Sequence, residues 1–334
     1  MARRTVAVIF SFDIQRQIVS PAVRERMAQE FSLLLPAAEG KVTPEHAAEM
    51  LRDADGCMTC WGSPNLSAEL LAKAPKLRIV AHSAGSVKFL VSDALFERGI
   101  VVTSAAAEIA VDVAQFTIGE IILGLKNVME LSPHVAQGEF RGIKGHCAPD
   151  DPRGAIVGVI SASHVGRNVL KLLPHFGMPA LLYDPYVSSS QAQALGAEKV
   201  ELDELFERSD VVTCHAPSIP ATRHMVNAAR LAKMRDGAVF VNTARGSCVD
   251  EQALVTELQK RRIWAFLDVF DPEPPPPGSP LHSCPNLTMT PHIAGSVGRG
   301  RLRLGAQALS ELEAYFTGKP VQYPVTKDML EQTG

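Results

Sequence analysis

The 334-residue sequence lacks several features that mark whole classes of protein. Its charge has no strong bias, because 33 Lys and Arg residues stand against 36 Asp and Glu residues and leave a net charge of −3. Such a balance gives no indication of binding to nucleic acid or to an anionic membrane, and a small-molecule ligand is the better expectation. With 46% hydrophobic and 21% charged residues, the chain is typical of a globular protein of about two domains.

The sequence also lacks an uninterrupted hydrophobic run long enough to cross a membrane. The longest candidate, IAVDVAQFTIGEIILGL, carries Asp112 and Glu120, whereas a transmembrane helix needs about 18 or more apolar residues. The N-terminal MARRTVAVIFSF has a short apolar run that stops at Asp13 without a small-residue cleavage site, so we expect a first strand there and no signal peptide. These absences predict a cytoplasmic protein.

Cysteines are few, and no second C-x-x-C motif is present to complete a zinc site. The only close pair is Cys57 and Cys60, in the strand-like run GCMTCW; the others are Cys147, Cys214, Cys248 and Cys284. Residues three apart on a strand point to opposite faces. We therefore interpret the pair as two core thiols and predict no metal site.

What is present is a regular alternation of apolar runs and amphipathic stretches. Strands are predicted at 5–10, 57–61, 77–83 and 100–105, and again after Pro152 at 155–161, 179–184, 210–217 and 237–244, followed by WAFLDVF and NLTMTP. A long helix at about 110–131 is apolar on much of its surface, which predicts packing against another domain or a second subunit. Strands alternating with helices predict an α/β fold with two doubly wound parallel-sheet domains.

The stretch VGVISASHVGRNVLKLL (157–173) keeps only one glycine of the dinucleotide fingerprint G-x-G-x-x-G. Gly166 retains the third position, which allows close packing of helix against strand, while Ser161 and Ser163 occupy the first two. A serine adds a Cβ that crowds a pyrophosphate, but also a hydroxyl able to donate to a phosphate oxygen at a helix N-terminus. The motif alone leaves open whether this turn binds a dinucleotide.

Asp184 follows the next predicted strand. A carboxylate at that place accepts hydrogen bonds from the adenosine ribose hydroxyls and repels a 2′-phosphate, which favours NAD over NADP as cofactor. The alternative is a turn residue that precedes Pro185.

Three ordered segments carry a resemblance to a known family. They are VNTARGSCVDEQAL (241–254), LDVFDPEP (267–274) and TPHIAGS (290–296), supported by CHAPSIPATRHMVN (214–227) and by the 157–186 unit. With them, residues 50–318 resemble the D-isomer-specific 2-hydroxyacid dehydrogenases, which include phosphoglycerate dehydrogenases and hydroxypyruvate–glyoxylate reductases. The resemblance implies a Rossmann-type NAD-binding domain at 107–292, inserted in a flavodoxin-like substrate domain of residues 1–106 and 293–334. It further implies a homodimer, with the active site in the cleft between the domains.

The resemblance places Arg245, Glu273 and His292 at the family's catalytic positions. Their chemistry suits hydride transfer between NAD(H) and a 2-hydroxy acid/2-keto acid pair, since Arg offers a bidentate fork for a carboxylate. His292 would act as general acid/base. A carboxylate beside the imidazole fixes its tautomer and favours its protonated form, so we expect Glu273 to tune His292.

The resemblance also implies the residues that contact the cofactor and the substrate. Asp268 takes the position that holds the nicotinamide carboxamide. The whole predicted cofactor-binding set is Ser161, Ser163, His164, Val165, Gly166, Asp184, His215, Ala216, Pro217, Thr222, Thr243, Ala244, Asp268 and Gly295. The predicted substrate-binding set is Trp61, Gly85, Ser86 and Arg245.

The loop RIVAHSAGSVKFL departs from the family pattern, because Lys88 stands where an acid is usual. Two roles suit this lysine: recognition of a second anionic group on the substrate, or a solvated surface charge, which we favour. Trp61 is expected to cap a hydrophobic substrate tail. We expect no regulatory domain after residue 330, which disfavours a serine-pathway enzyme with an amino-acid-sensing tail.

Two alternatives share the expected fold. One is a non-enzymatic, NAD-sensing binding protein that resembles the corepressors with the same Arg-Glu-His set, although this chain lacks the long disordered arms typical of such adaptors. The other is a dehydrogenase of a different small anion, such as phosphite. The sequence does not choose among 2-hydroxy acids, because that choice depends on loop contacts.

Overall fold

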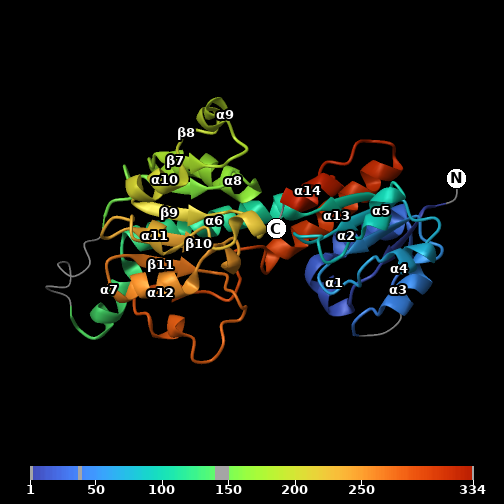
Figure 1. Ribbon diagram of the computed structural model, residues 1–334. Coiled ribbons are helices and arrows are strands. Elements are labelled where there is room, and N and C mark those ends of the chain that lie inside the picture. The colour runs from blue at the N-terminus through green and yellow to red at the C-terminus, as the bar shows by residue number, and fades with distance from the viewer. Residues whose placement is uncertain (1–2, 37–39, 140–149, 333–334) are drawn as a thin grey trace. The chain divides into compact units, whose positions relative to one another are not determined.

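The computed structural model describes residues 3–36, 40–139 and 150–332. The chain forms two compact units: unit 1 contains the residues up to Ile109 and those from Ser296 onward, and unit 2 is Ala110–Gly295. The predicted boundaries, 106/107 and 292/293, lie a few residues before these. Each unit is a parallel sheet flanked by helices (Figure 1), so the predicted α/β fold class is confirmed.

Unit 1 has a five-stranded sheet in the order β2-β1-β3-β4-β5. This is the flavodoxin-like order, which reverses between β1 and β3. The strands are β1 (Thr5–Val8), β2 (Ser32–Leu34), β3 (Gly56–Thr59), β4 (Ile79–His82) and β5 (Val101–Ser104). The helices are α1 (Phe12–Ile18), α2 (Pro21–Glu30), α3 (Pro44–Leu51), α4 (Ala68–Ala72), α5 (Asp93–Glu97), α13 (Arg299–Phe316) and α14 (Lys327–Gln332).

Unit 2 has a seven-stranded sheet in the order β12-β11-β10-β9-β6-β7-β8. The order reverses between β6 and β9, as it does in dinucleotide-binding folds. The strands are β6 (Val157–Ile160), β7 (Ala180–Tyr183), β8 (Ala197–Lys199), β9 (Val211–Cys214), β10 (Val239–Asn242), β11 (Trp264–Leu267) and β12 (Leu287–Met289).

The helices of unit 2 connect these strands. They are α7 (Val128–Ala136), α8 (His164–Leu172), α9 (Ser189–Ala194), α10 (Leu202–Arg208), α11 (Ala228–Leu231) and α12 (Glu251–Gln259), with the 3-10 turns η2 (Leu173–Phe176), η3 (Pro220–Thr222), η4 (Gly246–Cys248) and η5 (Pro280–Ser283). Helix α6 (Ala106–Leu125) starts in unit 1 and continues into unit 2.

The predicted helix at 110–131 is interrupted at residues 126–127. Helix α6 ends at Leu125, and α7 begins only after Asn127, whose φ of 50° is left-handed. Asparagine adopts this conformation more readily than most residues, so it breaks the helix where the apolar pattern continues. The short strands β2 and β8 and the helix α1 were not predicted either.

The prediction for Cys57 and Cys60 is confirmed. Cys57 packs with Leu51 on one face of the unit 1 sheet, and Cys60 packs with Phe10 in the cluster on the other face. Burial raises the pKa of Cys57 far above its usual range and that of Cys60 to about 12. Both are inert core thiols.

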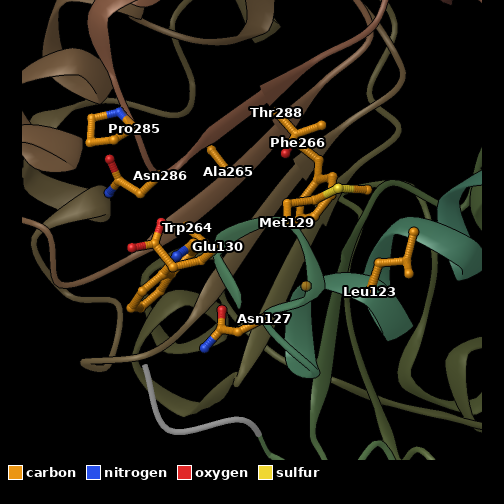
Figure 2. A pocket seen from close by; sticks show the side chains of 11 residues that line it. Leu123, Asn127, Met129, Glu130, Trp264, Ala265, Phe266, Pro285, Asn286 and Thr288 are labelled. Atoms are coloured by element: carbon orange, nitrogen blue, oxygen red, sulfur yellow. The ribbon is translucent and has the colours of Figure 1, made fainter. Parts of the chain in front are cut away.

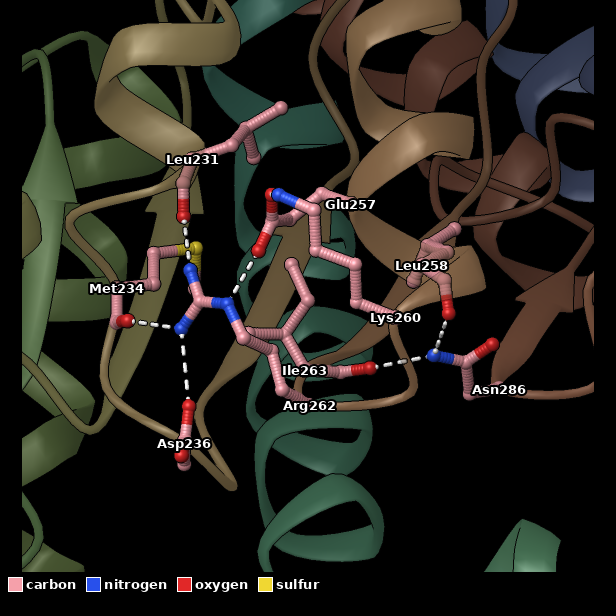
Figure 3. A network of polar contacts seen from close by, with 9 residues as sticks. All are labelled: Leu231, Met234, Asp236, Glu257, Leu258, Lys260, Arg262, Ile263 and Asn286. Carbon is pink, nitrogen blue, oxygen red and sulfur yellow. Dashed lines mark hydrogen bonds and ion pairs between the residues drawn. The ribbon is translucent and has the colours of Figure 1, made fainter.

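The amino edge of the unit 2 sheet is held by a polar network around Arg262, just before β11 (Figure 3). Its guanidinium donates to the carbonyls of Leu231 (2.8 Å) and Met234 and to the carboxylates of Asp236 (3.2 Å) and Glu257. The side-chain amide of Asn286 donates to the carbonyls of Leu258 (3.0 Å) and Ile263 (2.6 Å). These contacts satisfy carbonyls at the ends of α11 and α12.

A small cavity lies near the same edge, between α6–α7 and the starts of β11 and β12 (Figure 2). Its volume of about 10 Å³ is lined by Asn127, Glu130, Trp264 and Asn286, among others. Such a volume holds about one water molecule. The cavity is therefore too small for a nucleotide or a keto acid.

Candidate active site

The candidate site residues of unit 2 follow the carboxyl ends of its strands. In a doubly wound sheet, ligands bind at this edge, beside the point where the strand order reverses. In unit 2 that point lies between β6 and β9, so the turn after β6 and the loop after β9 flank it.

The turn after β6 keeps the geometry of a glycine turn with serine in place of glycine. Ser161 has a φ of 78°, a left-handed conformation that favours glycine. A Cβ on Gly166 would lie 1.9 Å from the carbonyl oxygen of Ser161, so the third position admits only glycine. The Ser163 hydroxyl accepts a hydrogen bond from the Gly166 amide (3.3 Å) and caps α8. The turn and the helix N-terminus that receive a pyrophosphate are therefore present.

Asp184 ties this turn to the end of β7. Its carboxylate accepts hydrogen bonds from the amides of Ala162 and Tyr186, both at 2.8 Å, and a long one from the Ser161 hydroxyl (3.4 Å). The side chain is buried. A carboxylate has about four acceptor positions, so capacity for a ribose hydroxyl is left. The 2′-phosphate of NADP would be repelled by this negative charge, so the site fits NAD better than NADP.

Arg167 is a residue at this turn that was not predicted. It is exposed on the first turn of α8, and its Nε donates to the carbonyl oxygen of Ala162 (2.8 Å). An arginine directly after the fingerprint glycine places a cation at the N-terminus of a helix. This position is visible in the sequence and could have identified Arg167. His164 is exposed and Val165 is half-buried in the same turn.

The loop after β9 turns its side chains inward. His215 is buried, its Nε2 lies 3.0 Å from the Thr213 hydroxyl, and burial lowers its pKa to about 3, so its imidazole is neutral. Ala216 is buried and Pro217 half-buried. The Thr222 hydroxyl donates to the Pro217 carbonyl and accepts from the Ile219 amide (3.1 Å), so it closes the loop.

The chain after β10 presents Arg245. Thr243 is buried and shares a hydrogen bond with Thr117 of α6, hydroxyl to hydroxyl at 2.9 Å, and the amide of Ala244 donates to the Asn242 side chain (3.1 Å). The half-buried Arg245 donates to the carbonyl of Ala244 (2.6 Å). Among the described carboxylates, none forms an ion pair with it. Most of its donors are therefore available to a ligand.

Glu273 and His292 form a hydrogen-bonded pair. The imidazole Nδ1 lies 2.6 Å from Oε1 of Glu273, and Oε2 accepts from the Phe270 amide (3.2 Å). The side chains are 51% and 37% exposed for His292 and Glu273, so the imidazole can meet a ligand. His292 has a left-handed φ of 54°, and strained backbone of this kind clusters at functional sites.

Asp268 fixes the loop that carries His292. The fully buried carboxylate accepts hydrogen bonds from the Thr290 hydroxyl (2.6 Å) and from the amides of Ile293 and Ala294 (both 2.8 Å). The Asp268 carbonyl accepts from the His292 amide (3.0 Å). Gly295, the last residue of unit 2, is half-buried.

Glu120 of α6 is a second buried carboxyl near Asp268. Burial, reinforced by the negative charge of Asp268, raises the pKa of Glu120 to about 8. Its Oε2 has no hydrogen-bond partner within the described part of the chain. The sequence contains Glu120, but only as an acid that interrupts an apolar run, so its position near Asp268 was not predicted.

Apart from Arg245, the predicted substrate residues follow strands at the carboxyl edge of the unit 1 sheet. Trp61 follows β3, is 37% exposed, and has the guanidinium of Arg301 5.5 Å from its ring centre. Gly85 and Ser86 are half-buried in the loop after β4, and Lys88 is exposed. His82 at the end of β4 is buried beside the Thr59 hydroxyl (2.9 Å), and burial lowers its pKa to about 4.

Among the helices that the structure describes, none combines the length and the apolar character needed to cross a bilayer.

Comparisons with known proteins identify the family of the chain. The family model for "D-isomer specific 2-hydroxyacid dehydrogenase, NAD binding domain" matches residues 118–294. A D-3-phosphoglycerate dehydrogenase of Methanocaldococcus jannaschii is 30% identical over 298 residues, 87% of this chain and 55% of that protein, so the chain spans about half its length. A glyoxylate reductase of Thermofilum pendens is 32% identical over 301 residues, 88% of each chain.

The fold also matches a solved structure. The D-mandelate dehydrogenase of Rhodotorula graminis has a TM-score of 0.84 at 23% identity, with 98% of each chain covered. That identity supports the fold alone. Because the family model covers just over half of the chain and the glyoxylate reductase covers most of it, the chain belongs to the D-isomer specific 2-hydroxyacid dehydrogenase family, with unit 2 as the NAD-binding domain.

Proposed function

We propose that the protein is an NAD-dependent dehydrogenase that interconverts a 2-hydroxy acid and a 2-keto acid. The observation that supports this best is the His292–Glu273 hydrogen bond of 2.6 Å. His292 follows β12, Glu273 follows β11, and Arg245 follows the adjacent β10. One edge of the sheet therefore presents an acid/base group and a cation.

Arg245 is the group that binds the substrate carboxylate. A guanidinium is charged at any working pH and grips a carboxylate through two parallel hydrogen bonds. No described carboxylate neutralises it, and its single backbone bond leaves the rest of its fork free. Its charge also stabilises the negative charge that develops on the carbonyl oxygen during reduction.

His292 delivers a proton to the carbonyl oxygen in reduction and removes it in oxidation. Glu273 accepts from Nδ1, which fixes the tautomer and leaves Nε2 for the substrate. Asp268 has a positioning role, because its carboxylate holds Ile293 and Ala294, the residues that follow the histidine. Its contact with a nicotinamide carboxamide stays a prediction.

NAD supplies the hydride acceptor, and NADH the hydride donor, when bound. The Ser161–Gly166 turn and the capped start of α8 would hold the pyrophosphate, with Arg167 as an added cation. Asp184 would accept from the ribose hydroxyls. The neutral His215, with Ala216, Pro217, Thr222, Thr243 and Ala244, lies on loops at the same edge.

The substrate is a small 2-hydroxy or 2-keto acid. Relatives include a glyoxylate reductase and a D-3-phosphoglycerate dehydrogenase. Trp61, Gly85 and Ser86 remain predicted substrate contacts. A preference for a phosphorylated acid over glyoxylate would favour the anion-binding role for Lys88.

A fluorescence titration of the purified chain with NADH, and separately with NADPH, tests the cofactor assignment. We expect saturable binding of NADH and at least tenfold weaker binding of NADPH. The double variant Ser161→Gly/Ser163→Gly is the matched sample. Binding only by the glycine variant would mean that the serine turn has closed the cofactor site.

Reduction of glyoxylate, hydroxypyruvate and phenylglyoxylate, followed by loss of NADH absorbance, tests the reaction. We expect His292→Asn to lower kcat on the order of a hundredfold or more while NADH still binds. Tight NADH binding without turnover of any keto acid would instead favour the NAD-sensing, corepressor-like alternative. Turnover of phosphite and of no keto acid would favour the other alternative.

We further propose a homodimer and a cytoplasmic location. Support for the dimer comes from exposed apolar side chains on α6 and α7, namely Val111, Val128, Met129 and Val135. The described cysteines are free, as is usual in a reducing compartment. Light scattering during size exclusion would test the dimer, and a Met129→Asp variant that stayed dimeric would exclude this face.

A further inference from the structure

Arg301, in the first turn of α13, is a cation whose described partners are all uncharged. Its guanidinium lies 5.5 Å from the centre of the Trp61 ring and donates to the side-chain oxygen of Gln17. Its Nε makes a long hydrogen bond to the carbonyl oxygen of Ser296 (3.4 Å). No carboxylate in the described part of the chain forms an ion pair with it. A guanidinium has more donors than these bonds use, so Arg301 keeps donors for an anion.

Arg301 lies where the strand order of unit 1 reverses. The order β2-β1-β3-β4-β5 turns back between β1 and β3. Ligands of doubly wound sheets bind beside such a point, outside the carboxyl ends of the strands. Gln17 belongs to α1, the helix that follows β1, whereas Trp61 follows β3. Because Arg301 contacts both residues, it bridges the two segments that flank the reversal point.

Close packing holds Arg301 in this place. Helix α13 lies so near α1 that a Cβ on Gly305 would be 2.2 Å from the carbonyl oxygen of Ile18. Gly305 is four residues after Arg301 and therefore on the same face of the helix. The turn after β3 also lies against α1, since a Cβ on Gly62 would be 3.8 Å from the Ile14 side chain. Both elements meet the same helix, which keeps the cation beside the indole ring.

Other arginines that contact or belong to α13 are paired with carboxylates. Arg303 donates to Glu108 (2.7 Å), and Arg26 of α2 donates to Glu313 near the far end of α13. These two cations connect helices to one another. Arg301 differs from them, because its charge is not neutralised by a described carboxylate although it lies at a ligand-binding edge.

Two exposed aromatic rings and a second cation share this edge. Trp61 is 37% exposed, and Phe89, in the loop after β4, is 48% exposed. The side-chain amide of Asn65 donates to the Phe89 carbonyl (2.8 Å), so the loops after β3 and β4 are joined. Lys88 is exposed beside Phe89 and has no ion-pair partner among the described residues. This surface suits a ligand with a short carbon chain that ends in an anion.

We propose that Arg301, beside Trp61, binds an anionic group at the far end of the substrate, so that the preferred substrates are 2-keto acids with a second negative charge. This inference rests on the proposed function, in which Arg245 binds the carboxylate next to the keto group. The second group is a carboxylate or a phosphate, since a guanidinium binds either through paired hydrogen bonds. The indole ring stabilises the cation through its π face and keeps water from one side of it.

Matched pairs of keto acids test the proposal and separate the two anions. 2-Oxoglutarate is compared with 2-oxopentanoate, which has the same carbon chain without the second carboxylate, and phosphohydroxypyruvate is compared with hydroxypyruvate. We expect kcat/KM of the native chain to favour the charged member of at least one pair by about tenfold or more. Reduction of the uncharged members with no preference in either pair would overturn the inference and leave the proposed function standing.

Variants show whether Arg301 carries the preference. Arg301→Gln should remove most of it and leave kcat/KM for the uncharged acid within about twofold of the native value, whereas Arg301→Lys should retain part of it. Arg26→Gln is the matched control and should keep the full preference. An equal loss on both acids in Arg301→Gln, or a preference that disappears in Lys88→Gln and not in Arg301→Gln, would overturn the proposal.

Fluorescence of Trp61 detects the anion without turnover. The chain has two tryptophans, so in Trp264→Phe the emission comes from Trp61 alone. We expect a saturable change with the preferred charged acid, in the presence or absence of NAD⁺, and a much weaker one with its uncharged partner. Adding Arg301→Gln should abolish the response, and circular dichroism checks that each variant is folded. Binding of the charged acid by a chain that reduces no keto acid would contradict the proposed function and leave the anion site standing.

Discussion

Two arginines at opposite edges of the unit 2 sheet differ in how many partners they have. Arg262, at the amino edge, donates to two carbonyls and two carboxylates and is 21% exposed (Figure 3). Arg245, at the carboxyl edge, donates to one neighbouring carbonyl. The same side chain is thus a structural tie at one edge and an available binding group at the other.

Two buried glutamates, Glu257 and Glu120, show the same contrast between a paired and an unpaired charged group. Burial opposes ionisation of Glu257 at the amino edge, but hydrogen bonds from Lys260 and Arg262 outweigh it and hold its pKa below the usual range. Glu120, near Asp268, has no such cation in the part of the chain that the structure describes, and its pKa is raised to about 8. At the amino edge, Arg262 and Glu257 satisfy each other's charges, whereas at the carboxyl edge Arg245 and Glu120 have no ion-pair partner among the described residues.

The largest expected effect is on activity, where a substitution of Arg245 should matter far more than one of Arg262. Arg245→Gln should lower kcat/KM on the order of a hundredfold to a thousandfold, because the carboxylate grip is lost. Its free energy of unfolding should change by less than about 0.5 kcal/mol, since few native contacts are removed. Steady-state kinetics and chemical denaturation measure both. A large loss of stability would show that Arg245 is a structural residue.

The next prediction compares the two glutamates by how stability depends on pH. The folded chain holds the Glu120 proton more tightly than the unfolded chain, so stability should fall as pH rises from about 4.5 to 8 and level off above. The loss is on the order of 5 kcal/mol. Glu120→Gln should flatten this slope in denaturation at pH 5.5, 7 and 8.5.

Glu257→Gln is the matched control for that slope. The folded-state pKa of Glu257 is lowered, so its stabilising contribution is present above the usual carboxyl range and is lost as pH falls. Glu257→Gln should therefore lower stability at pH 7. An unchanged slope in Glu120→Gln would show that Glu120 does not carry the effect.

A smaller effect comes from Arg262. Arg262→Gln should cost about 2 kcal/mol of stability, because Glu257 stays buried with Lys260 as its remaining cation partner. The value of kcat/KM should stay within about twofold of the native chain, since the network is at the far edge of the sheet. If Arg262→Gln lost as much activity as Arg245→Gln, the two edges of the sheet would not differ in function.

The smallest effect is expected at the turn after β6. Ser161→Gly should raise stability by about 0.5–1 kcal/mol, because it relieves a left-handed φ of 78°. Gly166→Ala is the opposite change and should destabilise the turn, since the added Cβ meets the Ser161 carbonyl. Thermal unfolding of both variants checks this. Equal destabilisation by the two would mean that the serine hydroxyl matters more than the strain.

The sequence predicted the strand-helix alternation well because apolar runs and capping residues are local signals. Ser20, Thr43 and Ser67 cap α2, α3 and α4 through their hydroxyls. The break at Asn127 was missed, because the apolar pattern of 110–131 runs through it. The edge strands β2 and β8 are only three residues each and carry too short a pattern to recognise.

By itself, the sequence determined the fold class, the family and the three residues that suit hydride transfer, since these depend on residue type and spacing along the chain. Only the tertiary structure decided which polar groups are satisfied. It bonded Glu273 to His292, used Asp268 to hold the histidine loop, and placed Glu120 near Asp268 with no cation beside it among the described residues. The physical reason is that burial and hydrogen bonding are set by segments distant in sequence, which meet only when the strands align.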